Sequence, residues 1–149
     1  MIIMDNYETP QKIFNEICDT FRIYPKLDVC ATEQNSKCDQ YFSKSDNSFL
    51  QNWSQDFFMN CPYSNCKKWV KYAYLQHIKH NVNGLALLNV STGAAYWHDF
   101  IFKKASIRFY QSRIKFELNG IAQNNPRYDS AFICWSKRKE KRGKRKEKE

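Results

Sequence analysis

Long apolar runs are absent from this sequence. No segment approaches the roughly 20 consecutive apolar residues of a membrane-spanning helix, and no apolar stretch of the signal-peptide kind stands at the N-terminus. With 149 residues, 42% of them hydrophobic, the chain can form one compact core and hardly a second one. We therefore expect a soluble, cytoplasmic protein built around a single domain.

Cysteine pairs are missing as well. The chain has six cysteines, none in a Cys-x-x-Cys pair, at positions 18, 30, 38, 61, 66 and 134. The spacing of Cys30, Cys38, Cys61 and Cys66 matches none of the usual zinc-binding patterns. We interpret the six residues as reduced thiols and expect no metal site.

Acidic residues are too few to balance the basic ones, and the excess positive charge is unevenly placed. Of the formal net charge of +9, residues 137–149 contribute +6, from nine Lys or Arg and three Glu, which leaves +3 for the rest. Such a run cannot bury apolar surface, so we predict a folded domain over 1–136 and a disordered basic tail over 137–149. The tail is suited to a nucleic-acid backbone, and a simple solubility tail is an equally good interpretation.

Hydrophobic spacing predicts alternating helices and strands. Apolar residues at helical spacing predict a first helix from Pro10 to about Phe21, with Thr9 as its N-cap. Further helices are predicted at about 67–80 and 92–102, and strands within 26–32, 40–43, 56–59, 84–91, 106–111, 114–117 and 130–135. Residues 33–54 are predicted to be mostly loop. This order predicts an α/β fold whose sheet is mostly parallel with an antiparallel edge.

Ligands of such sheets bind outside the carboxyl ends of the strands, where the strand order reverses. The loops after Asp28 and Met59 are predicted to lie at such ends.

Several single residues also allow a functional or a structural interpretation. His77 and His80 lie at the end of an amphipathic helix, and we interpret them as solvated rather than as metal ligands. We expect the four tryptophans to be core residues, at positions 53, 69, 97 and 135. A solvated edge and phosphate contact remain equally open for three basic residues, Arg108, Arg113 and Lys115.

The segment Asn60-Cys61-Pro62-Tyr63 carries the sharpest functional signal, because it follows an apolar strand and precedes a helix. An exocyclic amine that attacks a methyl sulfonium needs acceptors for its hydrogens, so that its lone pair points at the methyl group. The Asn60 side-chain oxygen and the Cys61 backbone carbonyl can be those acceptors. Tyr63 offers a face on which a flipped-out base can stack, and Pro62 stiffens the turn. These are also ordinary turn residues, and their placement is what favours function.

A series of short motifs runs from Thr9 to about Trp135. In order, they are Thr9-Pro10, Leu27-Asp-Val-Cys-Ala-Thr32, Asn35, Lys37-Cys38, Tyr41-Phe42, Asn52-Trp53, the turn at 60–63, Trp69 and Arg113-Ile-Lys-Phe116. Together these motifs resemble the phage-type, Dam-like DNA N6-adenine methyltransferases. Several sparse motifs in the right order are more specific than any one of them.

The resemblance implies a Rossmann-like methyltransferase fold that uses S-adenosylmethionine and needs no metal. It implies a catalytic turn formed by Asn60, Cys61, Pro62 and Tyr63, and a cofactor site formed by Thr9, Pro10, Asp28, Ala31, Thr32 and Asp46. The sequence departs from the family where Cys61 replaces the first Pro of the turn and where Asn52 replaces an acidic residue. At position 61 the backbone carbonyl is kept, although one φ restraint is lost. No glycine-rich turn follows Asp28, so the cofactor site is inferred from the resemblance.

The resulting hypothesis is transfer of a methyl group from S-adenosylmethionine to N6 of adenine in double-stranded DNA, in the cytoplasm of a host cell if the protein is viral. Methyltransferases that act on cytosine N4, RNA guanine or protein glutamine use the same turn and remain alternatives. A non-catalytic DNA-binding relative is the hypothesis from another class, with Cys61 marking decay of the turn. No separate recognition domain is evident, which predicts a short recognition site or low sequence selectivity. The oligomeric state is left open.

Overall fold

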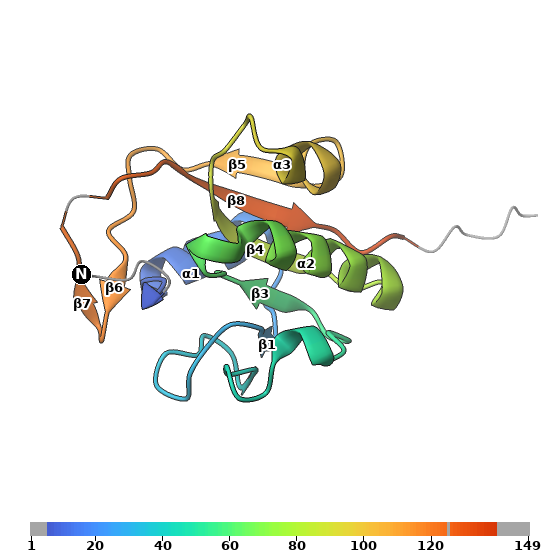
Figure 1. Ribbon diagram of the computed structural model, residues 1–149, viewed down its shortest axis with the longest axis horizontal. Coiled ribbons are helices and arrows are strands. Elements are labelled where there is room, and N and C mark those ends of the chain that lie inside the picture. The colour runs from blue at the N-terminus through green and yellow to red at the C-terminus, as the bar shows by residue number, and fades with distance from the viewer. Residues whose placement is uncertain (1–5, 125, 140–149) are drawn as a thin grey trace, which may run out of the picture.

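One six-stranded sheet organises the protein in a computed structural model that describes residues 6–124 and 126–139 (Figure 1). In spatial order its strands are β2 (Gln40–Tyr41), β1 (Leu27–Asp28), β3 (Phe57–Met59), β4 (Gly84–Asn89), β8 (Ser130–Trp135) and β5 (Ser106–Phe109). The first four pair in parallel, which confirms the predicted α/β class with a mostly parallel sheet.

The antiparallel pairs lie at one edge of the sheet, as predicted. β8 is antiparallel to both β4 and β5, so it lies one strand in from the edge, and β5 is the edge strand. All six residues of β8 are buried, whereas three of the four residues of β5 are exposed. A strand that is apolar on both faces is stable inside a sheet, and a partly polar strand tolerates the edge.

Helices cover both faces of the sheet (Figure 1). α1 (Gln11–Phe21) packs on one face, while α2 (Cys66–His80) and α3 (Ala95–Phe100) pack on the other. Successive strand residues alternate between the two faces. Phe58 therefore contributes to the core under α1, and its neighbours Phe57 and Met59 contribute to the core under α2 and α3.

The start of α1 differs from the sequence prediction. Pro10 precedes the helix, and its carbonyl accepts hydrogen bonds from the backbone N–H groups of Ile13 and Phe14, at 3.0 and 3.1 Å. No side chain caps the helix, so the prediction of Thr9 as N-cap was wrong. The Thr9 hydroxyl is instead bonded to the side chain of Asn60.

A two-stranded hairpin stands apart from the main sheet (Figure 1). It consists of β6 (Glu117–Leu118) and β7 (Ile121–Ala122), where the sequence predicted one strand at 114–117. Both turn residues, Asn119 and Gly120, have positive φ, at 52° and 77°. Asn-Gly is the strongest short-range signal for such a turn, and it is present in the sequence.

Two short 3-10 helices complete the described elements, η2 (Ser48–Leu50) and η3 (Tyr63–Asn65). Residues 33–54 are otherwise mostly loop, as predicted. Trp53, Trp97 and Trp135 are buried and Trp69 packs against the same core, which confirms their interpretation as core residues. His77 is buried too, with Nδ1 2.7 Å from the carbonyl oxygen of Val82, so the interpretation of this residue as solvated was wrong.

The start of the basic tail is attached to the loop after α2. The backbone N–H groups of Lys137 and Arg138 donate to the side-chain oxygens of Asn83 and Asn81, at 2.6 and 2.9 Å. The remainder of the predicted disordered tail, from residue 140, lies outside the described residues. Within 6–124 and 126–139, no helix is long and apolar enough to cross a membrane, and no group of three or more His, Cys, Asp or Glu is placed to hold a metal ion.

Gly84 opens β4 directly opposite Phe57, and the two residues are in close contact. A Cβ atom at position 84 would lie 2.8 Å from Cε2 of Phe57, whose side chain is fully buried. We expect Gly84→Ala to lower the free energy of unfolding by about 1–3 kcal/mol through overpacking, as measured by chemical denaturation. Gly93→Ala is the matched control, because a Cβ there meets nothing within 4 Å. Equal stability of the two variants would contradict the packing at Gly84.

Candidate active site

The turn at 60–63 lies where the strand order reverses. β2 pairs on one side of β1 and β3 on the other, and Asp28 at the end of β1 is in register with Phe58. Asn60 follows β3 directly, so the loops after Asp28 and Met59 open at the same edge of the sheet. This confirms their predicted placement at neighbouring carboxyl ends, the usual position of ligand sites in such sheets.

The Asn60 side chain is held by a residue 51 positions earlier in the chain. Its Nδ2 donates a hydrogen bond to Oγ1 of Thr9 at 2.9 Å. Thr9 is only 3% exposed, and Asn60 is half-buried. One of the two N–H groups on Nδ2 is thereby occupied, and the amide oxygen, which points to the other side of the amide, is available as an acceptor.

Cys61 turns its side chain into the core. Cys61 is buried, and its Sγ atom lies 3.5 Å from Sγ of Cys66. The hydrogen bond with Cys66, together with burial, raises the pKa of the Cys61 thiol well above its usual range. At neutral pH the thiol is therefore protonated and a poor nucleophile. The side chain acts as a small apolar group in the core, and the polar group that position 61 can offer a ligand is its backbone carbonyl.

Tyr63 forms one wall of a small pocket. Its ring stacks on that of Tyr128, with ring centroids 6.0 Å apart and planes 29° apart. Burial raises the pKa of Tyr63 to about 12, although a hydrogen bond with Asn89 acts against that rise, so the phenol is neutral at physiological pH. The pocket lies between the turn and the end of β4, and its lining is Asn60, Cys61, Tyr63, Cys66, Leu87, Leu88, Asn89 and Phe116.

Sequence reasoning missed Asn89, Phe116 and Tyr128 as part of this site. Asn89 had a signal, because it is a polar residue at the end of an otherwise apolar strand. Tyr128 had none, because it lies in an irregular loop that only the folded chain brings to Tyr63.

Asp28 shapes the loop after β1. Its carboxylate accepts hydrogen bonds from the backbone N–H groups of Cys30 at 3.2 Å and Lys37 at 3.0 Å. It is 3% exposed, and this burial raises its pKa to about 6. Along the same loop, Ala31 is buried, while Thr32 is exposed and exchanges two hydrogen bonds with Asn35. Asp28 thus orders the loop from beneath, and Thr32 lies at its surface.

Asp46 lies on the next loop, which follows β2. Its Oδ2 accepts hydrogen bonds from the backbone N–H and the hydroxyl of Ser43, at 2.8 and 2.9 Å. These bonds lower the pKa of the exposed Asp46 carboxyl, so it is ionised at neutral pH. Its Oδ1 remains open to a donor from solvent or a ligand.

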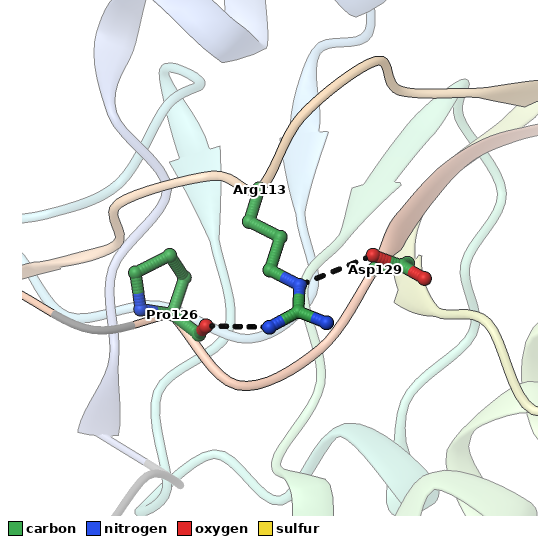
Figure 2. A network of polar contacts seen from close by, with 3 residues as sticks. All are labelled: Arg113, Pro126 and Asp129. Carbon is green, nitrogen blue, oxygen red and sulfur yellow. Dashed lines mark hydrogen bonds and ion pairs between the residues drawn. The ribbon is translucent and has the colours of Figure 1, made fainter.

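The basic residues of the late strands have different surroundings. Arg113 Nε lies 3.2 Å from Oδ1 of Asp129, and its Nη1 donates to the carbonyl of Pro126 at 3.4 Å (Figure 2). This arginine joins the segment before β6 to the segment before β8. Both members of the ion pair are more than half exposed, so the pair adds little stability. Arg108 and Lys115 are exposed, and neither forms an ion pair among the described residues.

The arrangement defines an α/β protein with a polar turn, an acceptor amide and an aromatic ring at the reversal of strand order. The chain matches the sequence model of the family described as DNA N-6-adenine-methyltransferase (Dam) over residues 2–145. It is 34% identical over 115 residues to the DNA N-6-adenine-methyltransferase of Haemophilus phage HP1 (strain HP1c1). The chain belongs to this Dam family.

The match to the phage protein covers 75% of this chain and 66% of the phage protein, so the chain spans just under two thirds of the length of that relative. No solved structure matches the chain.

The buried Asp28 predicts a pH dependence of stability. Its pKa in the folded protein, about 6, is above its ordinary value of 3.8, so the folded state binds the proton more tightly. This contribution is fully present below pH 3.8 and is lost as the pH rises through 6. We expect the free energy of unfolding of the wild type, measured relative to Asp28→Asn, to fall by about 2–3 kcal/mol between pH 4 and 7. Denaturant titrations at several pH values check this, and parallel profiles for the two proteins would refute it.

Proposed function

We propose that the chain is a DNA methyltransferase that transfers a methyl group from S-adenosylmethionine to N6 of adenine. The observation that carries this proposal is the Asn60-to-Tyr63 turn at the reversal of strand order, in a chain of the Dam family. The related phage protein is named for the same activity. A Rossmann-like methyltransferase topology is part of the proposal, supported by the parallel strands that flank the turn.

The turn would activate the amine by positioning it. One N–H of the adenine amine donates to the Asn60 amide oxygen, and the other donates to the Cys61 carbonyl. Both bonds direct the nitrogen lone pair away from the ring and toward the methyl group, which lowers the barrier mainly through orientation. S-adenosylmethionine, when bound, supplies the electrophilic methyl group. The Cys61 thiol takes no part, since it is buried and protonated.

Tyr63 would hold the target base. An adenine inside a duplex cannot reach the turn, so the base is flipped out of the stack. The neutral Tyr63 ring offers it a flat, apolar face beside the acceptors. Pro62, whose φ is −57°, fixes the backbone between the carbonyl of Cys61 and this ring.

The cofactor would bind over the loops that follow β1 and β2. S-adenosylmethionine carries hydroxyl and ammonium groups, which are donors, and the ionised Asp46 has an open oxygen to accept from them. The residues present therefore fit the group. Thr32 lies at the surface of the neighbouring loop, Ala31 lines it from within, and Asp28 keeps it folded. Pro10 precedes α1 and directly follows Thr9, whose hydroxyl is bonded to Asn60 at the same edge of the sheet.

The proposed partner is double-stranded DNA, and the proposed place is the cytoplasm of the host cell. The phage origin of the relative supports that location. The cations of the tail at 137–149 favour a phosphate backbone without reading its sequence.

The activity is tested by transfer of labelled methyl from S-adenosylmethionine to unmethylated duplex DNA, followed by nucleoside analysis. We expect the label in N6-methyladenine, and a loss of about 100-fold or more in Asn60→Ala, since one preorganised partner of the reacting group is removed. Asn65→Ala is the matched control, because Asn65 is exposed and its side chain caps no helix. Label in cytosine would keep the mechanism and change the base. No label in DNA, RNA or protein would favour a non-catalytic DNA-binding relative.

Cofactor affinity tests the role of Asp46. We expect Asp46→Ala to weaken binding of S-adenosylmethionine by about 10- to 100-fold, the usual loss for a hydrogen bond to a charged group, as measured by calorimetry. Asp39→Ala is the control, because Asp39 is also an exposed acid, at the opposite end of β2. Equal affinities of the two variants would remove Asp46 from the cofactor site.

A further inference from the structure

The hydrogen bond between Thr9 and Asn60 joins the two segments that the proposed chemistry needs most. The Thr9 hydroxyl is almost fully buried, and its oxygen accepts from Nδ2 of Asn60 at 2.9 Å. Resemblance to the family assigns Thr9 to cofactor binding. The structure instead directs its side chain at the amide of the catalytic turn.

An asparagine amide can present its oxygen on one side while a partner on the other side accepts from its nitrogen. A threonine hydroxyl can accept or donate, so it anchors the far end of the amide, and the substrate amine, which can only donate, selects the oxygen. Rotation of the amide by half a turn would place the N–H group where the oxygen belongs, and two donors would then face each other at the adenine amine. The Thr9 oxygen supplies the acceptor that Nδ2 requires. It also spares the half-buried N–H group the cost of an unmade hydrogen bond.

Thr9 is itself fixed from both sides. The backbone N–H of Glu8 donates to the carbonyl of Glu117 in β6 at 2.7 Å, and the N–H of Glu117 donates back at 2.9 Å. The carbonyl of Pro10 is bonded to the first turn of α1. In α1, the ring of Phe14 packs edge-on against the ring of Phe58, with the ring centroids 4.9 Å apart. Phe58 lies two residues before Asn60. A hydroxyl restrained this way can hold a side chain with the accuracy that catalysis needs.

We propose that Thr9 is a positioning residue, which orients the Asn60 amide so that its oxygen faces the substrate amine. This inference rests on the proposed function, because it assigns a role within the same reaction. Thr9 does not touch the reacting atoms and acts through Asn60. The backbone hydrogen bonds between Glu8 and Glu117 connect Thr9 to the hairpin of β6 and β7, so this hairpin also helps to hold Thr9 in place.

The test compares Thr9→Val, which keeps the shape and loses the hydroxyl, with Thr9→Ser, which keeps the hydroxyl. We expect kcat of Thr9→Val for methyl transfer to fall by about 10- to 100-fold, the scale of a misplaced catalytic group. Its KM for DNA and its dissociation constant for S-adenosylmethionine should stay within about 3-fold of the wild type, because no ligand contact is removed. Thr9→Ser should restore kcat to within about 3-fold.

The possible outcomes separate this inference from the proposed function. A wild type without methyl transfer to any substrate refutes the proposed function, and the inference falls with it. An active wild type with an unchanged kcat in Thr9→Val overturns the inference alone. Weaker cofactor binding with unchanged kcat also overturns it, and assigns Thr9 to the cofactor. If thermal denaturation shows that Thr9→Val does not fold, Thr9→Ala replaces it with the same expectations, because it removes the hydroxyl without adding a methyl group in its place.

Discussion

The parallel pairing of β3 with β1 and β4 is the constraint on which the site depends. These strands have only three, two and six residues, yet each is almost wholly buried. β3 and β4 contribute to the cores on both faces of the sheet, and β1 contributes Leu27 to the core under α2 and α3. Their register brings Asp28, Asn60 and Asn89 to one edge of the sheet, because each residue ends or directly follows its strand. A shift of the β3 register by one residue would turn Phe58 to the opposite face of the sheet, away from the core under α1, and would displace the Asn60 amide as well. The chemistry of the turn is thus set by apolar packing beneath it.

The Arg113-to-Phe116 segment shows how one short motif can serve both fold and site. Ile114 and Phe116 are buried in the core under α1, while Arg113 connects two irregular segments at the surface. Phe116 also lines the pocket beside the turn. The motif precedes β6, whose first residue is bridged to Glu8. Core packing, the hairpin and the N-terminal segment consequently meet within a few residues of Asn60.

Local signals allowed much of this to be predicted from the sequence. The order of helices and strands, the mostly parallel sheet and the placement of the turn at 60–63 all follow from apolar runs and from residues next to one another in the chain. Contacts between distant segments could not be predicted in this way. The Thr9 hydroxyl was predicted to cap the start of α1, and only the folded chain brings Asn60 to it instead. The insertion of β8 between β4 and β5 and the burial of His77 are likewise decided by tertiary packing.

Because β8 runs in the reverse direction, the two ends of the domain lie at opposite edges of the sheet. Trp135, the last residue of β8, pairs with Gly84, the first residue of β4, so the chain leaves the sheet at the edge opposite the turn. The N-terminal segment, by contrast, passes beside Asn60 through Glu8 and Thr9. In a chimaeric protein, a DNA-targeting module joined directly after Lys139 would begin at the edge of the sheet opposite the turn, whereas the same module joined directly before Glu8 would begin beside Asn60. The two ends of the described part of the domain are therefore unequal attachment points.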